Sequence, residues 1–486
     1  MNQHSRFPRR PYSVLWAEMH VTCWLVGGLR CSQAFSRLAG TDVNSRRLSV
    51  LIAGEVVAMS RFYDWVCKGY LVLAAGILVS PAGCGSTPSG NTPDGKQAAA
   101  RAALEKHDAK LTEKDGKIVR VALGPEGNDA DLALLQDLPT VEHLTADKRG
   151  VTDEGLAALK NHPGLKTLDL SISGITNAGL AHLQELPKLE EVILKRCDLT
   201  APAYVEIAKC KTLKRIRAPQ SNFDDECLAA LKDCAQLELI DLQDCNRVTE
   251  KGLEVLRNFP KLKFLRLWGP TITDKVLSYV SEAKALRTLS LEATPVGPEG
   301  LAQVKGLTNL QELKLSSAAN ITSASLEQIA GHSHLQVLEL RNTAVGSKGM
   351  VHLAGLKELR VLDLSETAVG DKGLASLKGL TNLEDLNLWQ STTSDAGLEN
   401  IAGMTKLKRL NLDKCKVTDA GIAHLQGLQD LEFLHLGSTS VGDPGLEGLH
   451  GLKKLNKLEI TFLPGVTDEG VRKLKEALPG LKEIIR

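Results

Sequence analysis

The side chains best suited to chemistry in this sequence are its ten cysteines. None of them forms a C-x-x-C pair, the spacing with which a chain usually holds a structural zinc ion. Buried free thiols that pack as small apolar groups are the favoured interpretation. A disulfide between neighbouring repeats stays open, because exported proteins often contain disulfides. The cysteines concerned recur in the repeats described below, and they are Cys197, Cys210, Cys227, Cys234, Cys245 and Cys415.

The sequence lacks the common catalytic signatures. It contains no G-x-S-x-G, H-E-x-x-H, G-x-G-x-x-G or G-x-x-x-x-G-K-[ST] motif, so the usual nucleophile, zinc and phosphate sites have no support. The histidines after residue 84 are scattered, and His182, His352 and His424 recur at one position of the repeat. We therefore predict a protein that is not an enzyme and that has no cofactor and no metal site.

Cys84 has a different setting, because it follows an apolar run. Residues 70–80, YLVLAAGILVS, are long enough for a signal peptide and too short to span a membrane. Arg61 and Lys68 precede this run, and the small residues Ala82 and Gly83 come directly before the cysteine. The pattern resembles a bacterial lipoprotein signal, in which the cysteine receives a lipid and becomes the mature N-terminus. The resemblance implies a lipid on Cys84 and a place in the cell envelope, at the periplasmic or outer surface of a membrane; cleavage as an ordinary secretory signal is the alternative.

Composition divides the first part of the chain into segments. Residues 1–58 contain arginine but no lysine, and we expect them to be disordered or to be an over-extension of the reading frame, with Met59 the true start. Residues 59–83 would then be the signal peptide, and the Gly, Ser, Thr and Pro of 84–96 would form a flexible tether. A lead-in at 97–117 would follow, with an amphipathic capping helix over 97–113.

One phrase recurs from residue 118 to residue 486. Its clearest copy is LRVLDLSETAVGDKGLASLKGLTN, residues 359–382, and the copies follow one another at about 24 residues. The L-x-x-L-x-L pattern and this period resemble leucine-rich repeats. The resemblance implies an α/β solenoid of about 15 repeats, a curved arc with a parallel sheet of short strands on its concave face and helices on its convex face.

Each part of the phrase has a physical role. Leu362 and Leu364 alternate with Val361 and Asp363, which is the period of a short strand with one buried face. The ninth position of many repeats carries Ser, Thr or Cys, whose hydroxyl or thiol can bond the backbone of a buried bend. A helix start such as VTDEGL (151–156) follows, where Thr or Asp would cap the first turn. The glycine two residues after the Asp lowers helix propensity, so we expect it to permit close approach of adjacent coils.

The subtype resembles two known groups of repeats. Cys210 and Cys234 lie at the second cysteine position of the cysteine-containing repeats of F-box proteins, and the TDxGLxxLxxL phrase is similar to repeats abundant in planctomycete-like bacteria. The first resemblance leaves a substrate-recognition adaptor of a ubiquitin ligase as an alternative function. No F-box-like helical module precedes the repeats, so that role does not transfer with the repeat type.

The concave face is where the predicted repeats would bind a partner. The residues between the two strand leucines form a column, named here the central column: Asp169, Ile193, Arg217, Asp241, Arg266, Ser290, Lys314, Glu339, Asp363, Asn387, Asn411, His435 and Glu459. Aromatic and arginine side chains are the types most enriched in binding hot spots. The predicted binding residues are Arg217, Phe264, Arg266, Trp268, Asp363, Asn387, Trp389, Asn411, Phe433 and His435.

Charge limits the class of partner. The net charge is +1, and most of the excess of basic residues lies before Cys84, so the repeats are near neutral and lack the basic surface of a nucleic-acid-binding protein. Within the repeats, a basic cluster between Lys195 and Arg266 and an acidic cluster between Glu339 and Asp385 would orient a partner.

The sequence therefore predicts recognition of a protein, or of a glycan, by an exported and lipid-anchored protein that touches the membrane only through its anchor. A structural scaffold of the cell envelope without a specific ligand is the alternative. The last repeat has no separate capping module, so an end-to-end dimer is a further expectation unless the charged helix expected at 467–477 shields that end. The identity of the partner does not follow from the sequence.

Overall fold

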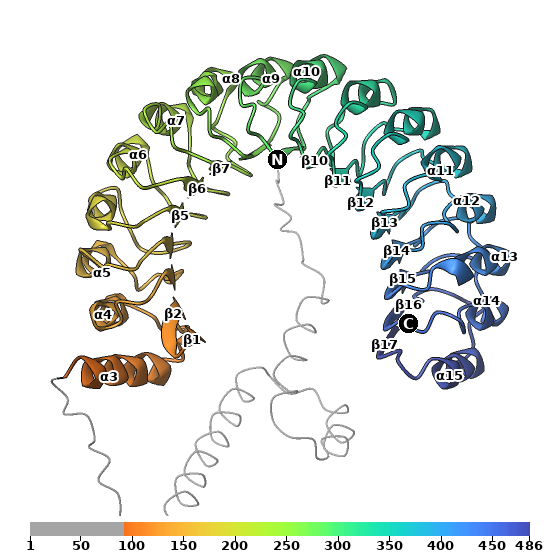
Figure 1. Ribbon diagram of the computed structural model, residues 1–486, viewed down its shortest axis with the longest axis horizontal. Coiled ribbons are helices and arrows are strands. Elements are labelled where there is room, and N and C mark those ends of the chain that lie inside the picture. Colours follow the sequence, from red (N-terminus) through yellow and green to blue (C-terminus); the bar gives the residue numbers. More distant parts are fainter. Residues whose placement is uncertain (1–91) are drawn as a thin grey trace, which may run out of the picture. The chain divides into compact units, whose positions relative to one another are not determined.

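The computed structural model describes residues 92–486, which form a curved solenoid of stacked coils with the strands on its concave side (Figure 1). The predicted fold class is confirmed. The segments 1–58 and 59–83, and Cys84 itself, lie outside the described residues. Strand β1 pairs antiparallel with β2, and every later strand pairs in parallel with the next one along the chain.

The described strands belong to one 17-stranded sheet. They are β1 (Lys110–Lys114), β2 (Lys117–Ala122), β3 (His143–Thr145), β4 (Thr167–Asp169), β5 (Glu191–Ile193), β6 (Arg215–Arg217), β7 (Leu239–Asp241), β8 (Phe264–Trp268), β9 (Thr288–Glu292), β10 (Glu312–Lys314), β11 (Val337–Glu339), β12 (Val361–Asp363), β13 (Asp385–Asn387), β14 (Arg409–Asn411), β15 (Phe433–His435), β16 (Lys457–Glu459) and β17 (Glu483–Ile485).

Short helices line the convex side of the solenoid (Figure 1). The α-helices are α3 (Pro93–Lys106), α4 (Asp129–Leu134), α5 (Asp153–Ala158), α6 (Ala201–Ala208), α7 (Asp225–Ala230), α8 (Glu250–Leu253), α9 (Asp274–Val280), α10 (Pro298–Val304), α11 (Asp371–Leu377), α12 (Asp395–Glu399), α13 (Asp419–Ile422), α14 (Asp443–Gly448) and α15 (Asp468–Ala477). The 3-10 helices are η2 (Leu135–Asp137), η3 (Gly179–Glu185), η4 (Glu254–Asn258), η5 (Ala324–Ile329), η6 (Ser347–Leu353) and η7 (Ala423–Gly427). Within residues 92–486, none of these helices has the length and apolarity that a membrane span needs.

The lead-in differs from the predicted helix over 97–113. Helix α3 begins at Pro93, where the Thr92 hydroxyl accepts a hydrogen bond from the Gly95 N–H, so the first turn is capped before the predicted start. After Lys106 the chain forms the β1–β2 hairpin instead of more helix. Asp115 and Gly116 both have positive φ in its turn, the conformation that an Asp-Gly pair favours in a two-residue hairpin.

The core consists of leucine side chains stacked from coil to coil. In the coil that begins at Leu359, the strand residues Leu362 and Leu364 and the helix residues Leu374 and Leu377 are all 0% exposed. Each buried leucine contributes about 2 kcal/mol relative to an exposed one. A single coil has no second layer to bury these side chains against, so the stabilisation arises between coils.

The six cysteines of the described region are free and buried, which confirms the favoured interpretation. At the ninth position, the thiols of Cys197, Cys245 and Cys415 donate to carbonyl oxygens of the preceding coil, at Sγ–O distances of 3.2, 3.0 and 3.0 Å. Hydroxyls at the same position, as in Thr343 and Thr439, donate to a carbonyl of their own coil. The predicted bonding of the buried bend by hydroxyls and thiols is therefore confirmed.

The Thr-Asp-x-Gly phrase joins neighbouring helices. The Asp395 carboxylate accepts hydrogen bonds from the N–H and the hydroxyl of Thr418 in the next coil, at 2.8 and 2.6 Å. The same pair of bonds links Asp153 with Thr176. Thr418 in turn accepts from the Ala420 N–H and so caps its own helix, as predicted. The Asp was expected to cap its own helix, and its bond to the following coil is a difference from that expectation.

The glycine of the same phrase makes room for this carboxylate. A Cβ at Gly421 would lie 2.2 Å from Oδ1 of Asp395, and a Cβ at Gly179 would lie 2.1 Å from Oδ1 of Asp153. Both distances are far below a van der Waals contact. The predicted close approach of adjacent coils at this glycine is thus confirmed, and the group that approaches is the aspartate of the preceding coil.

One residue of each successive coil has a left-handed backbone just after the strand. Ile172, Glu366 and Phe462 have φ values of 60°, 54° and 56°, a conformation that costs a residue other than glycine about 1–2 kcal/mol. The N–H of Glu366 donates to the Trp389 carbonyl at 2.8 Å, and that of Ile172 donates to the Lys195 carbonyl at 2.9 Å. The turn therefore extends the backbone ladder beyond the short strands.

The last coil ends differently from the others. The Asp468 carboxylate stands where earlier aspartates bind the following coil, and it accepts a hydrogen bond from the guanidinium of Arg486 instead. On the outer side of α15, Arg472 pairs with Glu469 and Glu476. The charged helix expected at 467–477 is thus present as α15, while the end-to-end dimer stays a prediction.

The aspartate bridges lead to a stability prediction. Because Asp395→Ala leaves the Thr418 N–H and hydroxyl without their partner, we expect the free energy of unfolding to fall by about 1–3 kcal/mol. Urea unfolding of the full chain measures this change. Glu399→Ala in the same helix is the matched control and should change the midpoint little. Equal midpoints for the two variants would show that the bridge between coils adds no stability.

Candidate functional site

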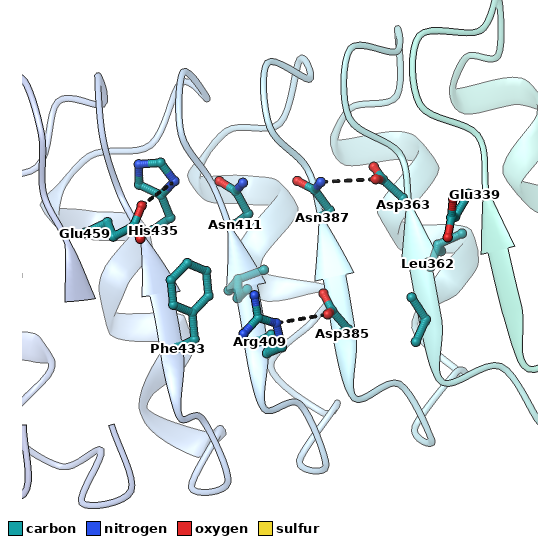
Figure 2. A pocket seen from close by; sticks show the side chains of 12 residues that line it. Glu339, Leu362, Asp363, Asp385, Asn387, Arg409, Asn411, Phe433, His435 and Glu459 are labelled. Atoms are coloured by element: carbon teal, nitrogen blue, oxygen red, sulfur yellow. Dashed lines mark hydrogen bonds and ion pairs between the residues drawn. The ribbon is translucent and has the colours of Figure 1, made fainter. Parts of the chain in front are cut away.

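The parallel register lays the outward strand residues in columns across the concave face. Glu339, Asp363, Asn387, Asn411 and His435 of the central column are register partners of one another in successive strands (Figure 2). The residue two positions earlier in each strand forms a second column, the lateral column, which contains Val361, Asp385, Arg409, Phe433 and Lys457. Neighbouring members of a column are one strand spacing apart, about 4.8 Å.

A hollow of about 330 Å³ lies between these two columns over β11 to β16. Five of the ten predicted binding residues line it: Asp363, Asn387, Asn411, Phe433 and His435. The other lining residues are Glu339, Val361, Leu362, Asp385, Arg409, Leu410 and Glu459. The remaining predicted residues, Arg217, Phe264, Arg266, Trp268 and Trp389, do not line the hollow.

The amide side chains of the hollow are fixed by their own strands. The Oδ1 atoms of Asn387 and Asn411 accept hydrogen bonds from the N–H groups two residues further on, those of Trp389 and Asp413, at 3.1 and 3.0 Å. The Asn387 Nδ2 donates to the Asp363 carboxylate at 3.2 Å (Figure 2). The amide positions are therefore held by the fold before any partner binds.

Arg409 and Asp385 belong to the hollow although neither was among the predicted binding residues. The Nε of Arg409 donates to the Asp385 carboxylate at 3.1 Å, and its guanidinium lies 4.6 Å from the centre of the Phe433 ring. Burial raises the pKa of Asp385, and the nearby charge of Asp363 adds to this effect, while Arg409 lowers it. Asp385, Arg409 and Phe433 follow one another at intervals of 24 residues, and this spacing in the sequence could have indicated that they are neighbours in the lateral column.

His435 lies at one end of the hollow and faces Glu459. Its Nδ1 is 3.5 Å from the Glu459 carboxylate, and its Nε2 is buried without a hydrogen-bond partner among the described residues. The neighbouring Gly437 leaves space for this ring, because a Cβ there would lie 2.8 Å from Nε2 and 2.5 Å from the Thr461 hydroxyl. The glycine thus sets how closely the imidazole and the next coil approach.

Two of the predicted aromatic binding residues, Trp389 and Phe433, lie between cations. The guanidinium of Arg341 lies 5.0 Å from the centre of the Trp389 ring, and the ammonium of Lys414 lies 5.2 Å from it. The ammonium of Lys457 lies 5.8 Å from the centre of the Phe433 ring. Lys457 is on β16 and Arg409 is on β14, so the two cations come from the strands on either side of Phe433. Both rings are half-buried.

The predicted charge clusters are largely paired across strands. Arg217 contacts Glu191 at 2.7 Å and Asp241 at 3.7 Å, and Arg266 contacts the same Asp241 at 3.4 Å. In the acidic region, Glu384 pairs with Lys408 at 2.7 Å. Partners 24 to 26 positions away in the chain therefore neutralise part of each cluster. The orientation of a partner by these clusters stays a prediction.

Trp268 lies in a more closed part of the face than expected. It is the last residue of β8. The Gln243 amide of the preceding coil donates a hydrogen bond to the Glu292 carboxylate of the following coil at 3.3 Å. Thr288 and Ser290 on β9 are 2% and 0% exposed although they occupy the concave side. Within residues 92–486, no group of three His, Cys, Asp or Glu side chains could hold a metal ion.

Glu292 yields a prediction for the pH dependence of stability. Burial, reinforced by the charge of Glu339, raises the pKa of Glu292. A raised carboxyl pKa adds stability below the ordinary pKa of glutamate, and this contribution is lost as the pH rises through the raised pKa. We therefore expect Glu292→Gln to unfold at higher urea concentration than the unsubstituted chain at pH 7, with a difference that shrinks in acid.

The control for this measurement is Glu299→Gln, which removes one charge at an exposed position of α10 on the convex side. Its effect should not follow the same pH course. An advantage of Glu292→Gln that stays constant from acid to neutral pH would contradict the assignment of the raised pKa.

Comparisons with known proteins agree with the geometry of the coils. A family model described as leucine-rich repeat region matches residues 218–401, and a second leucine-rich-repeat model matches residues 403–425. The chain is 27% identical over 158 residues to the antagonist of mitotic exit network protein 1 of Eremothecium gossypii. That alignment covers 30% of this chain and 40% of the relative, so the chain spans less than half the length of this curated protein.

Two solved structures are also similar. An internalin from Listeria monocytogenes is 18% identical, with a TM-score of 0.40 over 80% of this chain and 93% of that chain. A leucine-rich-repeat protein from Leptospira interrogans is 16% identical, with a TM-score of 0.47 over 72% of this chain and 91% of that chain. Neither likeness says what this chain binds. The models match less than half of the chain, while the period of the coils and the parallel sheet on the concave side give residues 118–486 the fold of a leucine-rich-repeat solenoid.

Proposed function

We propose that this chain is a non-catalytic recognition protein that binds a protein partner on its concave face, centred on the hollow over β11 to β16. The observation that carries the proposal is the hollow itself. It joins a half-buried aromatic ring, two amides in fixed orientation and charged groups of both signs in adjacent columns. Members of one column are about 4.8 Å apart and an extended polypeptide rises about 3.3 Å per residue, so a short segment lying along a column can contact several of its members.

The chemistry of the thiols supports a role without catalysis. Burial raises the pKa of Cys197 to about 11 and that of Cys210 and Cys227 to about 12. At neutral pH these thiols are protonated, and the thiolate is the form that acts as a nucleophile. Their hydrogen bonds and burial assign them to the core instead.

The proposed location is the cell envelope, with the solenoid tethered through a lipid on Cys84. The support is the sequence before that residue: a weakly basic segment, an apolar run and small residues. A tether of a few residues would lead from the anchor to helix α3 at Pro93. The concave face would then be presented to partners at the membrane surface.

Partner capture tests the proposed recognition surface. We expect the full chain to enrich a protein from an envelope extract, and we expect the double variant Asn411→Ala/Phe433→Ala to lower that enrichment at least tenfold. The reason is that the variant removes an amide and an aromatic face from the hollow while keeping the leucine core. Quantitative mass spectrometry of the captured proteins is the measurement.

The matched control carries two substitutions on the convex side, Val351→Ala and His352→Ala in η6, where Val351 is 59% exposed. It should capture as much partner as the unsubstituted chain. If no protein is enriched over an empty support, the chain is better described as an envelope scaffold without a specific ligand. An equal loss of captured protein in both double variants would show that the hollow is not the binding surface.

The anchor is tested separately. Cells that express the full chain with labelled palmitate should yield a labelled protein in the membrane fraction, and Cys84→Ala should abolish the label and release the protein from that fraction. Cys415→Ala serves as the control, because its thiol is buried at 4% exposure and should not affect labelling. An unlabelled parent chain would leave the recognition surface intact but would remove the proposed lipid anchor.

A further inference from the structure

One carboxylate of the hollow has no positive partner among the described residues. Asp363 on β12 accepts hydrogen bonds from the Ser365 N–H and hydroxyl at 2.8 and 2.5 Å, and from the Asn387 amide at 3.2 Å. All three donors are neutral. No ion pair of Asp363 occurs within residues 92–486, whereas the other acids around it are paired.

The neighbours of Asp363 increase the negative charge at this point. Glu339 is its register partner on β11, and Asp385 is diagonal to it on β13 (Figure 2). Like charges directly opposite each other on adjacent strands are destabilising. Lys314 pairs with Glu339 at 2.5 Å from the far side, and Arg409 pairs with Asp385. Three carboxylates therefore face the hollow against these two bound cations.

The surface below the carboxylates is apolar. Val361 lies in the lateral column between Val337 and Asp385, and both valines are half-buried and open to the concave side. Val361 lines the hollow together with Leu362. A basic side chain has the matching construction, because its methylene stem packs on apolar surface while its charged head reaches polar groups.

We propose that the Asp363 end of the hollow binds a lysine or arginine side chain of the protein partner. The stem would lie on Val361, and the charged head would be held between Asp363, Asp385 and Glu339. This inference rests on the proposed function and names the chemistry of the partner at one point. Its argument is charge complementarity: the head supplies the positive charge that Asp363 lacks and relieves the repulsion between the register partners Glu339 and Asp363.

The solenoid contains a matched control for the key residue. Asp169 occupies the same position of the central column on β4, and it accepts from the Ser171 N–H and hydroxyl at 3.0 and 2.5 Å. Asp363→Asn and Asp169→Asn therefore remove the same charge from the same local arrangement. Only the first lies in the hollow, and Asn keeps an oxygen that can accept the serine bonds.

The experiment selects peptides from a random-sequence display library with the immobilised full chain, with Asp363→Asn and with Asp169→Asn. We expect the unsubstituted chain and Asp169→Asn to enrich peptides with Lys or Arg at one shared position, at least tenfold over Gln and Glu. Asp363→Asn should lose this preference. Synthetic copies of the best peptide, with that residue as Lys, Arg, acetyl-lysine or Gln, then measure the loss of affinity directly.

Each other outcome overturns the inference in an identifiable way. A basic preference that survives in Asp363→Asn, or that disappears equally in Asp169→Asn, removes Asp363 from the role. Neutral or acidic peptides that bind the hollow and are lost in Asn411→Ala/Phe433→Ala leave the recognition function standing and refute the basic side chain. Binding of a glycan array without any peptide refutes both proposals.

Discussion

The structure depends on the burial of leucine side chains between successive coils. A coil has three to six strand residues and a helix of four to ten residues, too little to enclose the stripe formed by Leu362, Leu364, Leu374 and Leu377. Stacking removes those side chains from water and at the same time fixes the register of the strands. Because the register is constant, positions that recur at the repeat interval become neighbours in space. The proposed binding surface is thus a direct product of the core.

The same constraint explains how much of this structure can be predicted from the sequence. The period of about 24 residues and the buried leucines define the solenoid, and the glycine after Thr-Asp points to a close approach. The left-handed residue after each strand gives no such signal, since Ile172, Glu366 and Phe462 occupy it without glycine. Its conformation follows from a backbone bond to the next coil, which a single repeat does not contain.

The candidate site was harder to predict for a related reason. Aromatic and charged residues of the concave face were recognised by type, but their state depends on neighbours about 24 residues away. Arg217 is neutralised by Glu191 and Asp241, and Trp389 is bracketed by Arg341 and Lys414. Adding up the charges of a sequence segment does not show which of them form ion pairs with residues of a neighbouring coil. Comparing each charge with the residues one repeat before and after it would have revealed most of the ion pairs, and also that Asp363 lacks one.

The aspartate bridges on the convex side have a mechanical consequence. Each coil is joined to the next at its strand by backbone bonds, and many coils are also joined at the helix by a carboxylate such as Asp395. Opening the arc would stretch the bonds between strands, and closing it would stretch those between helices. The arc should therefore resist both opening and closing and keep one preferred curvature under load. Asp363, Glu339 and Asp385 come from three successive coils, so their separation is held by this curvature, and a bound chain must adapt its own shape to the arc.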